Sequence, residues 1–241
     1  MTLIIGLLCK DGVVIGADSI ATFGSEIEQE VSYKIEIYEE DVVIATSGDI
    51  GFSQLIKEQL GPRWHEIKLC TDVLEVKNQV SSQMWKQIEP AVNRSKLGQV
   101  SFGGCETIVA LPIDGAPKLL HFGKLSDPFE ITAETPFVSI GSGRRQADPF
   151  LAFIKRLFWD DMTPASILDG IFGIVWTLQH VSRVNAGLGI GGRQRIAILQ
   201  RRHANWSAEM LSEPHLSEYV QAIDDTENAL REYRAKFRSV Q

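Results

Sequence analysis

The sequence has too few cysteines and histidines, too widely spaced, to build a disulfide framework or a metal site. Its three cysteines, Cys9, Cys70 and Cys105, are odd in number and form no CxxC pair, which is typical of proteins from a reducing compartment. The five histidines show no spacing of metal ligands. We therefore expect a cytoplasmic protein that uses neither a metal nor another cofactor.

Positive charge and long apolar runs are also scarce. Lysine and arginine number 24 against 31 aspartates and glutamates, a formal net charge of −7, which argues against nucleic acid or an anionic membrane as the main partner. The most apolar helix candidate, residues 167–178, is too short to cross a bilayer. No basic region precedes the first apolar run, and Lys10-Asp11 interrupts that run, so we expect no signal peptide.

What the sequence does contain is a regular succession of hairpins and helices. Short β-rich runs flank the turns Lys10-Asp11-Gly12, Glu39-Glu40 and Asp114-Gly115, a pattern that predicts three hairpins. The expected strands are residues 2–9, 13–17, 35–38, 41–46, 107–111, 118–122, 137–140 and 195–199, and the expected helices are 49–60, 72–92, 145–158, 164–183 and 215–238. Hairpins and helices in this order indicate the α+β class rather than βαβ units.

The last helix is expected as an addition to one domain. We predict a single domain over residues 1–241, with a C-terminal helical extension at about residues 213–241. One face of the helix carries Leu216, Tyr219, Val220, Ile223, Leu230, Tyr233 and Phe237. A stripe this wide must be buried, either on its own subunit or against a neighbouring one.

The strongest chemical signal lies near the start of the chain. Thr2, Asp18 and Lys34 follow one another at intervals of sixteen residues, and Gly48 comes fourteen residues later. Removal of Met1 would place Thr2 at the N-terminus, where its hydroxyl can attack a carbonyl while its own α-amine accepts the proton. A carboxylate and an ammonium can tune that amine, and a glycine N–H can hold an oxyanion. Each residue alone fits an ordinary strand or turn, so the joint spacing carries the prediction.

Three segments resemble the active β-type subunits of the proteasome. Residues 2–22 read TLIIGLLCKDGVVIGADSIAT, residues 33–48 read YKIEIYEEDVVIATSG, and residues 138–154 read VSIGSGRRQADPFLAFI. They are similar to that family's first hairpin, its second hairpin and its GSG strand-to-helix turn. Small bacterial proteasome homologues known from betaproteobacteria look nearest, ahead of the bacterial relative called the ancestral β-subunit. The resemblance implies the N-terminal-nucleophile hydrolase fold, a four-layer αββα sandwich of two antiparallel sheets between helical layers.

The resemblance also implies a role for each matching residue. Thr2 is the nucleophile and its free α-amine is the base. Asp18 holds Lys34 charged and oriented, and the Lys34 ammonium favours the neutral form of the amine. The Gly48 N–H meets the developing oxyanion. Ser142, in the GSG turn, supports the amine, and its alternative reading is a turn residue ahead of a helix.

One loop departs from the family pattern. The family has an aspartate followed three residues later by a serine ahead of a late strand, whereas residues 184–192 read VNAGLGIGG. Asn185 stands for the aspartate in this comparison and no serine follows, so we expect incomplete support of Thr2. The spacing of Gly187, Gly189 and Gly192 matches a dinucleotide motif, but here a helix precedes it and a strand follows, the reverse of the required order.

The substrate side is read from the resemblance alone. An extended peptide is implied to pair with the strand after Asp18 by β-augmentation. The expected substrate-binding residues are Ser19, Ala21, Thr22, Thr46, Gly48 and Ile50, with Gln54 as a further pocket residue. Thr46 at the floor suggests a medium-sized pocket that accepts apolar side chains. The alternative is that some of these side chains face the core.

We therefore predict a threonine endopeptidase that assembles into rings of identical subunits and cuts peptides or unfolded proteins. An ATPase unfoldase is an open possibility as a partner. The alternatives are a catalytically silent ring subunit of the same fold and a small-molecule amidase of the same class. The single residue ahead of Thr2 favours the enzyme, because silent α-type subunits usually carry an extra helix there. A chain that keeps Met1 has no free amine on Thr2 and is expected to be inactive.

Overall fold

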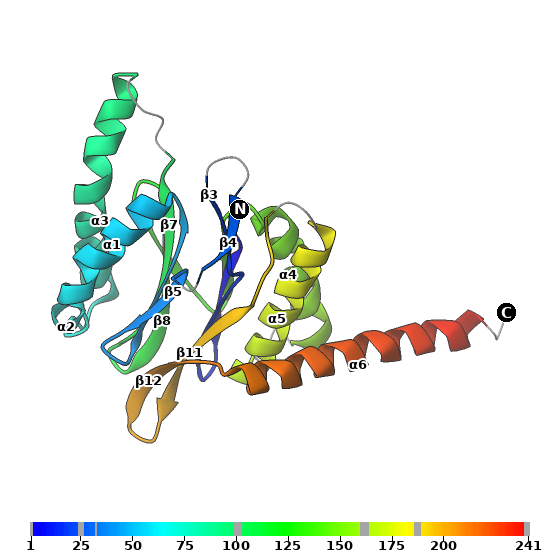
Figure 1. Cartoon of the computed structure of the whole chain (residues 1–241). Helices are drawn as coiled ribbons and strands as arrows, with labels where there is room; N and C mark the ends of the chain where they lie inside the picture. The colour runs from blue at the N-terminus through cyan, green and yellow to red at the C-terminus, as the bar shows by residue number, and fades with distance from the viewer. Residues whose placement is uncertain are drawn as a thin grey trace.

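The computed structural model describes residues 2–23, 27–31, 33–98, 103–159, 164–185 and 189–238. Two five-stranded antiparallel sheets stack face to face, and helices cover the outer face of each (Figure 1). The first sheet has the order β10-β1-β2-β11-β12 and the second has the order β5-β6-β7-β8-β9, while β3 and β4 form a separate hairpin. The predicted αββα sandwich is confirmed.

The elements agree with the expected ones to within a few residues. The strands are β1 (Ile4–Cys9), β2 (Gly12–Ala17), β3 (Ile20–Phe23), β4 (Ile27–Glu30), β5 (Ile35–Tyr38), β6 (Val42–Gly48), β7 (Cys105–Ile113), β8 (Ala116–Phe122), β9 (Pro128–Ile131), β10 (Phe137–Ile140), β11 (Arg195–Arg202) and β12 (Asn205–Met210). The helices are α1 (Ile50–Leu60), α2 (Trp64–Ile67), α3 (Val73–Lys96), α4 (Arg144–Phe158), α5 (Ile167–Val184) and α6 (Glu213–Arg238), with a 3₁₀ turn at Gly61–Arg63. The sequence analysis did not predict β4, β9, β12 or α2.

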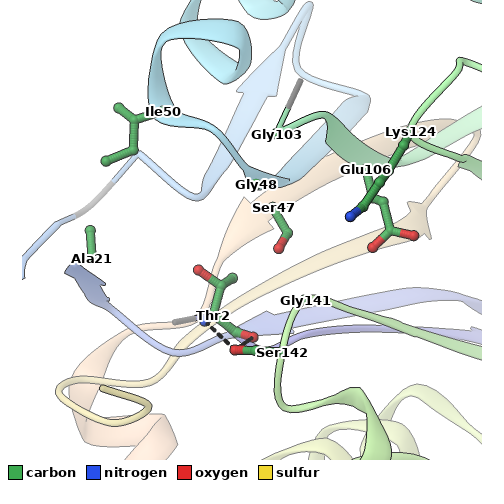
Figure 2. Close-up of a pocket in the computed structure, with 10 residues that line it drawn as sticks. All are labelled: Thr2, Ala21, Ser47, Gly48, Ile50, Gly103, Glu106, Lys124, Gly141 and Ser142. Carbon is green, nitrogen blue, oxygen red and sulfur yellow. Dashed lines mark hydrogen bonds between the residues drawn. The ribbon is translucent and has the colours of Figure 1, made fainter. Parts of the chain in front are cut away.

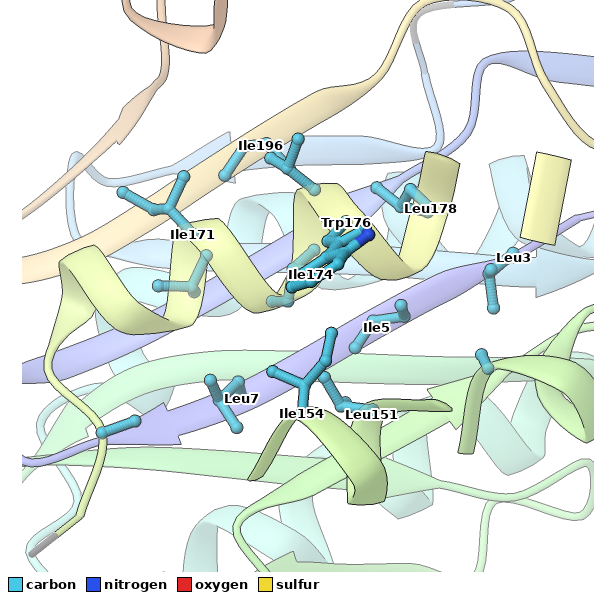
Figure 3. Packing of buried hydrophobic residues seen from close by; sticks show 14 of the residues in the cluster. Leu3, Ile5, Leu7, Leu151, Ile154, Ile171, Ile174, Trp176, Leu178 and Ile196 are labelled. Carbon is cyan, nitrogen blue, oxygen red and sulfur yellow. The ribbon is translucent and has the colours of Figure 1, made fainter. Parts of the chain in front are cut away.

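Strand β1 is apolar on both faces because each face meets a different layer. Leu3, Ile5 and Leu7 pack with residues of α4 and α5, as Figure 3 shows, whereas Ile4 belongs to the cluster between the two sheets. Side chains alternate along a strand, so a strand between two apolar layers needs an unbroken apolar run. Burial of each such side chain contributes at most about 1.5–3 kcal/mol. These contacts anchor the N-terminal segment that leads to Thr2.

Strand β6 follows the same rule in the second sheet. Val42 and Ile44 face the layer of α1 and α3, and Val43 and Ala45 face the other sheet. Continued alternation places the Thr46 side chain toward the helices and the next side chain in the space between the sheets. The two ends of β6 therefore present different residues to different layers.

A short cap turns the end of β6 into α1. Strand β6 ends at Gly48, and Asp49 caps α1 by accepting a hydrogen bond from the Phe52 N–H at 3.1 Å. Aspartate is a preferred cap because it satisfies one of the unpaired N–H groups of the first turn. This turn holds Gly48 at the end of the interior strand β6, close to Ile50 at the start of α1.

The C-terminal helix α6 divides into two parts. Ile223 is fully buried, and Leu216, Tyr219 and Val220 pack against the same core cluster as α5. Beyond Glu227, which accepts a hydrogen bond from Trp176 Nε1 at 3.0 Å, the helix projects away from the domain (Figure 1). Its apolar face is exposed there, at Leu230 and Tyr233. Within one subunit, the predicted burial of the apolar face is therefore found only in the first part of α6.

Three further observations concern the helices, the possible metal ligands and the cysteines in the described part of the chain. None of its helices is long and apolar enough to cross a membrane. Within the same residues, no cluster of three or more His, Cys, Asp or Glu side chains is arranged to hold a metal ion. Cys9, Cys70 and Cys105 are all free thiols.

Candidate active site

A cavity of about 420 Å³ opens beside Thr2, where several element ends meet. Thr2 precedes β1, Gly48 ends β6, and Gly141 follows β10 on the way into α4. The lining residues are Thr2, Ala21, Ser47, Gly48, Ile50, Gly103, Glu106, Lys124, Gly141 and Ser142 (Figure 2). Residues from both sheets and from the hairpin β3–β4 therefore share one opening at the edge of the space between the sheets.

The Asp18 carboxylate joins two of the predicted residues at one atom. Its Oδ1 accepts hydrogen bonds from the Leu3 backbone N–H at 2.8 Å and from Lys34 Nζ at 2.7 Å. Asp18 is 3% exposed and Lys34 is 4% exposed. Lys34 Nζ also donates to the Ile20 carbonyl at 2.5 Å. One carboxylate oxygen of Asp18 thus links the Lys34 ammonium to the backbone N–H of Leu3, the residue after Thr2.

The surroundings of Lys34 alter its acidity. Burial lowers the pKa of the Lys34 ammonium below its usual value, and the attraction of Asp18 partly offsets this effect. A charge out of water is stable only with a well-placed partner, and Asp18 supplies one. The pair can hold a positive charge that is out of solvent and linked, through the Leu3 N–H, to the backbone next to Thr2.

Gly48 is required by its backbone and by its neighbours. Its φ is +130°, a value that side-chain-bearing residues rarely adopt. A Cβ here would collide with the Gly104 carbonyl oxygen and lie 2.9 Å from Cys105 Cα. A side chain at this position is therefore excluded by the backbone at the start of the neighbouring strand β7.

The Gly48 N–H is directed away from β7. The N–H of Asp49 donates to the Gly104 carbonyl at 3.0 Å on the β7 side, whereas the N–H of Thr46 donates to the Lys34 carbonyl at 3.1 Å on the β5 side. Because N–H directions alternate along a strand, the Gly48 N–H points to the β5 side, past the first residue of β5. This is the geometry expected of a donor that is kept for an external acceptor.

The Gly141-Ser142-Gly143 turn holds Thr2 from the other side. The Thr2 backbone N–H donates to Ser142 Oγ at 3.2 Å, and the Gly143 N–H donates to the Thr2 carbonyl at 3.2 Å. Gly141 has a φ of +91°, and a Cβ there would collide with the Thr2 carbonyl. The structure thus brings Ser142 to the nitrogen of residue 2, the atom that the sequence analysis assigned to it.

The expected substrate-binding residues fall into two groups. Ala21 and Ile50 line the cavity, and the backbone of Thr22 lies in β3. Ser19 Oγ instead donates to Glu30 Oε1 at 2.9 Å. Thr46 is 4% exposed and faces α1, where its hydroxyl hydrogen-bonds with that of Ser53.

Two further predicted positions lie away from Thr2. Gln54 lines a separate hollow between β5 and α1. Asn185 ends α5 with its side chain buried, and among the described residues it has no hydrogen bond to Thr2 or Ser142. Residues 186–188, which include Gly187, lie outside the described part. The Gly191 N–H donates to Asp18 Oδ2 at 3.4 Å. The last part of the glycine-rich loop therefore contacts the Asp18–Lys34 pair.

Five lining residues were not predicted as site residues: the glycines Gly103 and Gly141, and the polar residues Ser47, Glu106 and Lys124. Ser47 and Glu106 are direct partners across β6 and β7, and such partners carry their side chains on the same face. Alternation along β6 could have placed Ser47 there, since Val43 and Ala45 face the same space. Nothing in the sequence pattern indicated Lys124, which follows β8 and packs its methylenes against Gly104.

Comparisons with known proteins agree with this architecture. The sequence model of a family described as proteasome subunit matches residues 2–171. A comparison with curated protein sequences finds no significant match. Among solved structures, Anbu, the ancestral β-subunit, from Yersinia bercovieri is similar, with a TM-score of 0.70 and 16% identity over 97% of this chain and 96% of that chain.

Two further solved structures are similar to the same extent. An Anbu (Gly-1) mutant from Hyphomicrobium sp. strain MC1 has a TM-score of 0.72 at 16% identity and covers 98% of this chain and 97% of its own. The Anbu complex from Pseudomonas aeruginosa, described as a helical assembly, has a TM-score of 0.69 at 18% identity and covers 95% and 96%. The sequence analysis ranked the ancestral β-subunit behind the betaproteobacterial homologues. At 16–18% identity, these similarities show the fold but do not distinguish between the two groups of relatives.

Proposed function

This chain belongs to the proteasome subunit family, and from that premise we propose that it is a threonine peptidase whose nucleophile is Thr2 after removal of Met1. The observation that carries the proposal is the shared Asp18 Oδ1, which accepts from the Leu3 N–H and from Lys34 Nζ. A buried ammonium tied to the first strand beside Thr2 is the arrangement that an N-terminal threonine needs in order to act as nucleophile and base.

The first half of the reaction forms an ester. Thr2 Oγ attacks the scissile carbonyl carbon while its proton passes to the free α-amine of the same residue, directly or through one water. An α-amine has an unperturbed pKa of about 7.7–8, and the Lys34 charge favours its neutral form. Collapse of the tetrahedral adduct breaks the C–N bond, and the protonated α-amine returns the proton to the leaving amine.

The second half hydrolyses the ester. A water gives a proton to the α-amine and adds to the ester carbonyl. Collapse of this adduct breaks the C–Oγ bond and releases the acid, and the protonated α-amine returns the proton to Thr2 Oγ. The Gly48 N–H, directed away from β7, donates to the oxyanion in both tetrahedral adducts. Ser142 Oγ, at 3.2 Å from the Thr2 nitrogen, orients the amine.

A peptide substrate would lie along β3. The backbone of Ala21 and Thr22 offers hydrogen bonds to an extended chain, and Ala21 with Ile50 lines an apolar end of the cavity. Ser19 and Thr46 support this wall through Glu30 and Ser53 rather than by touching the substrate. The substrate class is therefore a peptide or an unfolded protein with an apolar residue before the cut.

Assembly follows from the family premise. We propose closed rings of identical subunits in the cytoplasm, since one repeated heterologous contact produces either a ring or a helical filament. The related Anbu complex of Pseudomonas aeruginosa forms a helical assembly. An ATPase unfoldase would be needed only if folded proteins are substrates. In either assembly, access to Thr2 becomes restricted and short peptides are cut first.

The proposal competes with a catalytically silent ring subunit of the same fold. A retained Met1 would convert the Thr2 amine into an amide and remove the base. The third reading, a small-molecule amidase, predicts hydrolysis of small amides but not of peptides.

The test starts with the intact mass of the protein from its native host, to learn whether Met1 is removed. Processed protein should cut fluorogenic peptides and form a covalent adduct at Thr2 with threonine-directed inhibitors. Thr2→Ala should abolish both and keep the fold, since the side chain contributes little core volume. Full peptidase activity of Thr2→Ala would exclude Thr2 as the nucleophile. Light scattering on the same sample should report an assembly, and a monomer near 26.8 kDa would refute the ring.

A further inference from the structure

The cavity beside Thr2 has two chemically different ends. In Figure 2, Ala21 and Ile50 lie on one side of Thr2, whereas Glu106 and Lys124 lie on the other. Under the proposed function, the part of the peptide before the cut pairs with β3 beside Ala21. The part that leaves as the amine must therefore extend toward Glu106 and Lys124.

Glu106 is a charged group built into this second end. It lies in β7 directly opposite Ser47 of β6, and its side chain is 21% exposed. Its carboxylate lies 3.8 Å from His121 Nε2, and the interaction with His121 lowers the pKa of Glu106 despite its burial. A hydrogen bond from the Gly141 backbone and the Arg144 charge lower this pKa further. The carboxylate is thus anionic at neutral pH and lines the cavity, and its two oxygens have more acceptor sites than these neighbours use.

Ser47 provides an unused polar group at the same place. It is 6% exposed, and among the described residues its hydroxyl has no hydrogen-bond partner. Its Oγ lies 2.8 Å from the position of a Cβ built on Gly141, and Figure 2 shows it directed from β6 toward Thr2 and Gly141. The Ser47 hydroxyl is not one of the buried unsatisfied groups and lines the cavity, so a polar group of a bound molecule can hydrogen-bond with it in place of water.

Lys124 carries the opposite charge, but it is held differently. Its side chain is exposed, and no ion pair joins it to Glu106 within the described residues. An exposed ammonium on a flexible stem is well hydrated and screened by salt. Glu106 is the more buried of the two charges, so it acts at lower effective dielectric and governs the selection.

We propose that Glu106 and Ser47 form the subsite for the residue that follows the cleaved bond, and that this subsite selects a cationic side chain, lysine or arginine. The carboxylate accepts from the ammonium or guanidinium, and the Ser47 hydroxyl offers a second acceptor to the same group. The inference rests on the proposed peptidase function. It adds a preference on the leaving side to the apolar preference before the cut.

The activity test uses quenched fluorescent peptides that differ only in the residue after the cut: Lys, Gln or Glu. Processed wild-type protein should cut the Lys peptide with a kcat/KM about tenfold above that of the Glu peptide. Glu106→Gln should reduce this ratio below about threefold, and Lys124→Gln should increase it, because the opposing charge is lost. Glu89→Gln is the matched control, since it removes the same charge from an exposed position on α3 outside the cavity.

A binding test separates this inference from the function itself. The Thr2→Ala protein cannot form the ester, so fluorescence anisotropy with the same peptides reports affinity alone. We expect the Lys peptide to bind about tenfold more tightly than the Glu peptide, and the added Glu106→Gln change to remove the difference. Equal affinities, or a preference unchanged by Glu106→Gln, would overturn the subsite. A Lys preference in binding without any hydrolysis by processed wild-type protein would instead contradict the peptidase and leave the subsite standing.

Discussion

Two buried lysines in this protein have nearly the same surroundings but belong to different hydrogen-bond networks. Lys34 and Lys57 are each 4% exposed. Each has a carboxylate partner, Asp18 at 2.7 Å and Glu36 at 2.8 Å. Burial lowers the pKa of both ammonium groups, and the partner carboxylates partly offset this. A buried ion pair therefore does not by itself identify a functional lysine.

The difference lies in what else each network touches. The Asp18 carboxylate is buried and also holds the Leu3 N–H beside Thr2, whereas the Glu36 side chain is 35% exposed. Lys57 donates to the Tyr33 carbonyl, so it connects α1 to the segment that enters β5. The first network reaches the backbone next to Thr2, the proposed nucleophile. The second network joins α1 to the segment that carries Lys34. The position of a buried charge relative to Thr2 decides its role.

The largest expected effect comes from removal of the Lys34 charge. Lys34→Ala should remove nearly all peptide hydrolysis, because the α-amine of Thr2 loses the charge that keeps it neutral. Lys34→Arg should not rescue activity, since a planar guanidinium does not fit a site built for a compact ammonium. Steady-state kinetics on folded, processed protein measures this loss. If Lys34→Ala kept more than about a tenth of the wild-type rate, Lys34 would lower the activation free energy by less than about 1.4 kcal/mol. That result would contradict a catalytic difference between Lys34 and Lys57.

A second change tests the site without touching a charge. Gly48→Ala should reduce kcat by about 10²–10³, because the new Cβ collides with the Gly104 carbonyl and moves the donor N–H. The Asp18–Lys34 pair should be unaffected. Labelling by an inhibitor that reacts without forming an oxyanion is the control. Wild-type kcat in a folded Gly48→Ala protein would exclude this N–H as the donor.

The outer lysine should give a smaller effect of a different kind. Lys57→Met should reduce the free energy of unfolding by about 1–3 kcal/mol, through loss of hydrogen bonds made by a charged group. Because Glu36 stays partly in water, its charge is not stranded in the core. Denaturant titration measures the stability, and activity per folded molecule should stay within about threefold of wild type. A loss as large as that of Lys34→Ala would break the distinction between the two lysines.

The sequence, with its family resemblance, was sufficient to predict the layers, and it indicated the Asp18–Lys34 pair that the structure joins by a hydrogen bond. The strands 35–38 and 137–140 were predicted at their observed bounds. In both, a short apolar run predicts the strand and the adjacent turn residues predict where it ends. Strand β9 was missed because it begins with Pro128 and has exposed residues, a pattern that reads as a loop. Spacing along the chain located Thr2, Asp18 and Lys34, since each lies on or next to a strand of the first two hairpins.

The rest of the site depends on which face of a strand each residue occupies. Thr46 was expected at the pocket floor, yet alternation along β6 turns it to α1 and turns Ser47 to the cavity. Glu106 comes from a strand more than fifty residues later, and its place follows from the register with β6. Register between distant strands is set by tertiary packing, so local patterns do not reveal it.

The smallest expected effect comes from the end of α6, which contains neither a buried charge nor a cavity residue among those described. Removal of residues after Asn228 should change the unfolding temperature by less than about 2 °C, since Leu230 and Tyr233 are exposed. Truncation after Glu213 should instead be strongly destabilising, because it removes the buried Ile223 and its neighbours from the core; loss of one such side chain alone costs about 2–5 kcal/mol. Thermal melts of the two truncated proteins measure this contrast, and equal loss would show that the whole helix belongs to the core. Light scattering on the shorter deletion then assigns the projecting part: a smaller assembly with an unchanged melt places it in the contact between subunits, as the alternative for its apolar stripe requires.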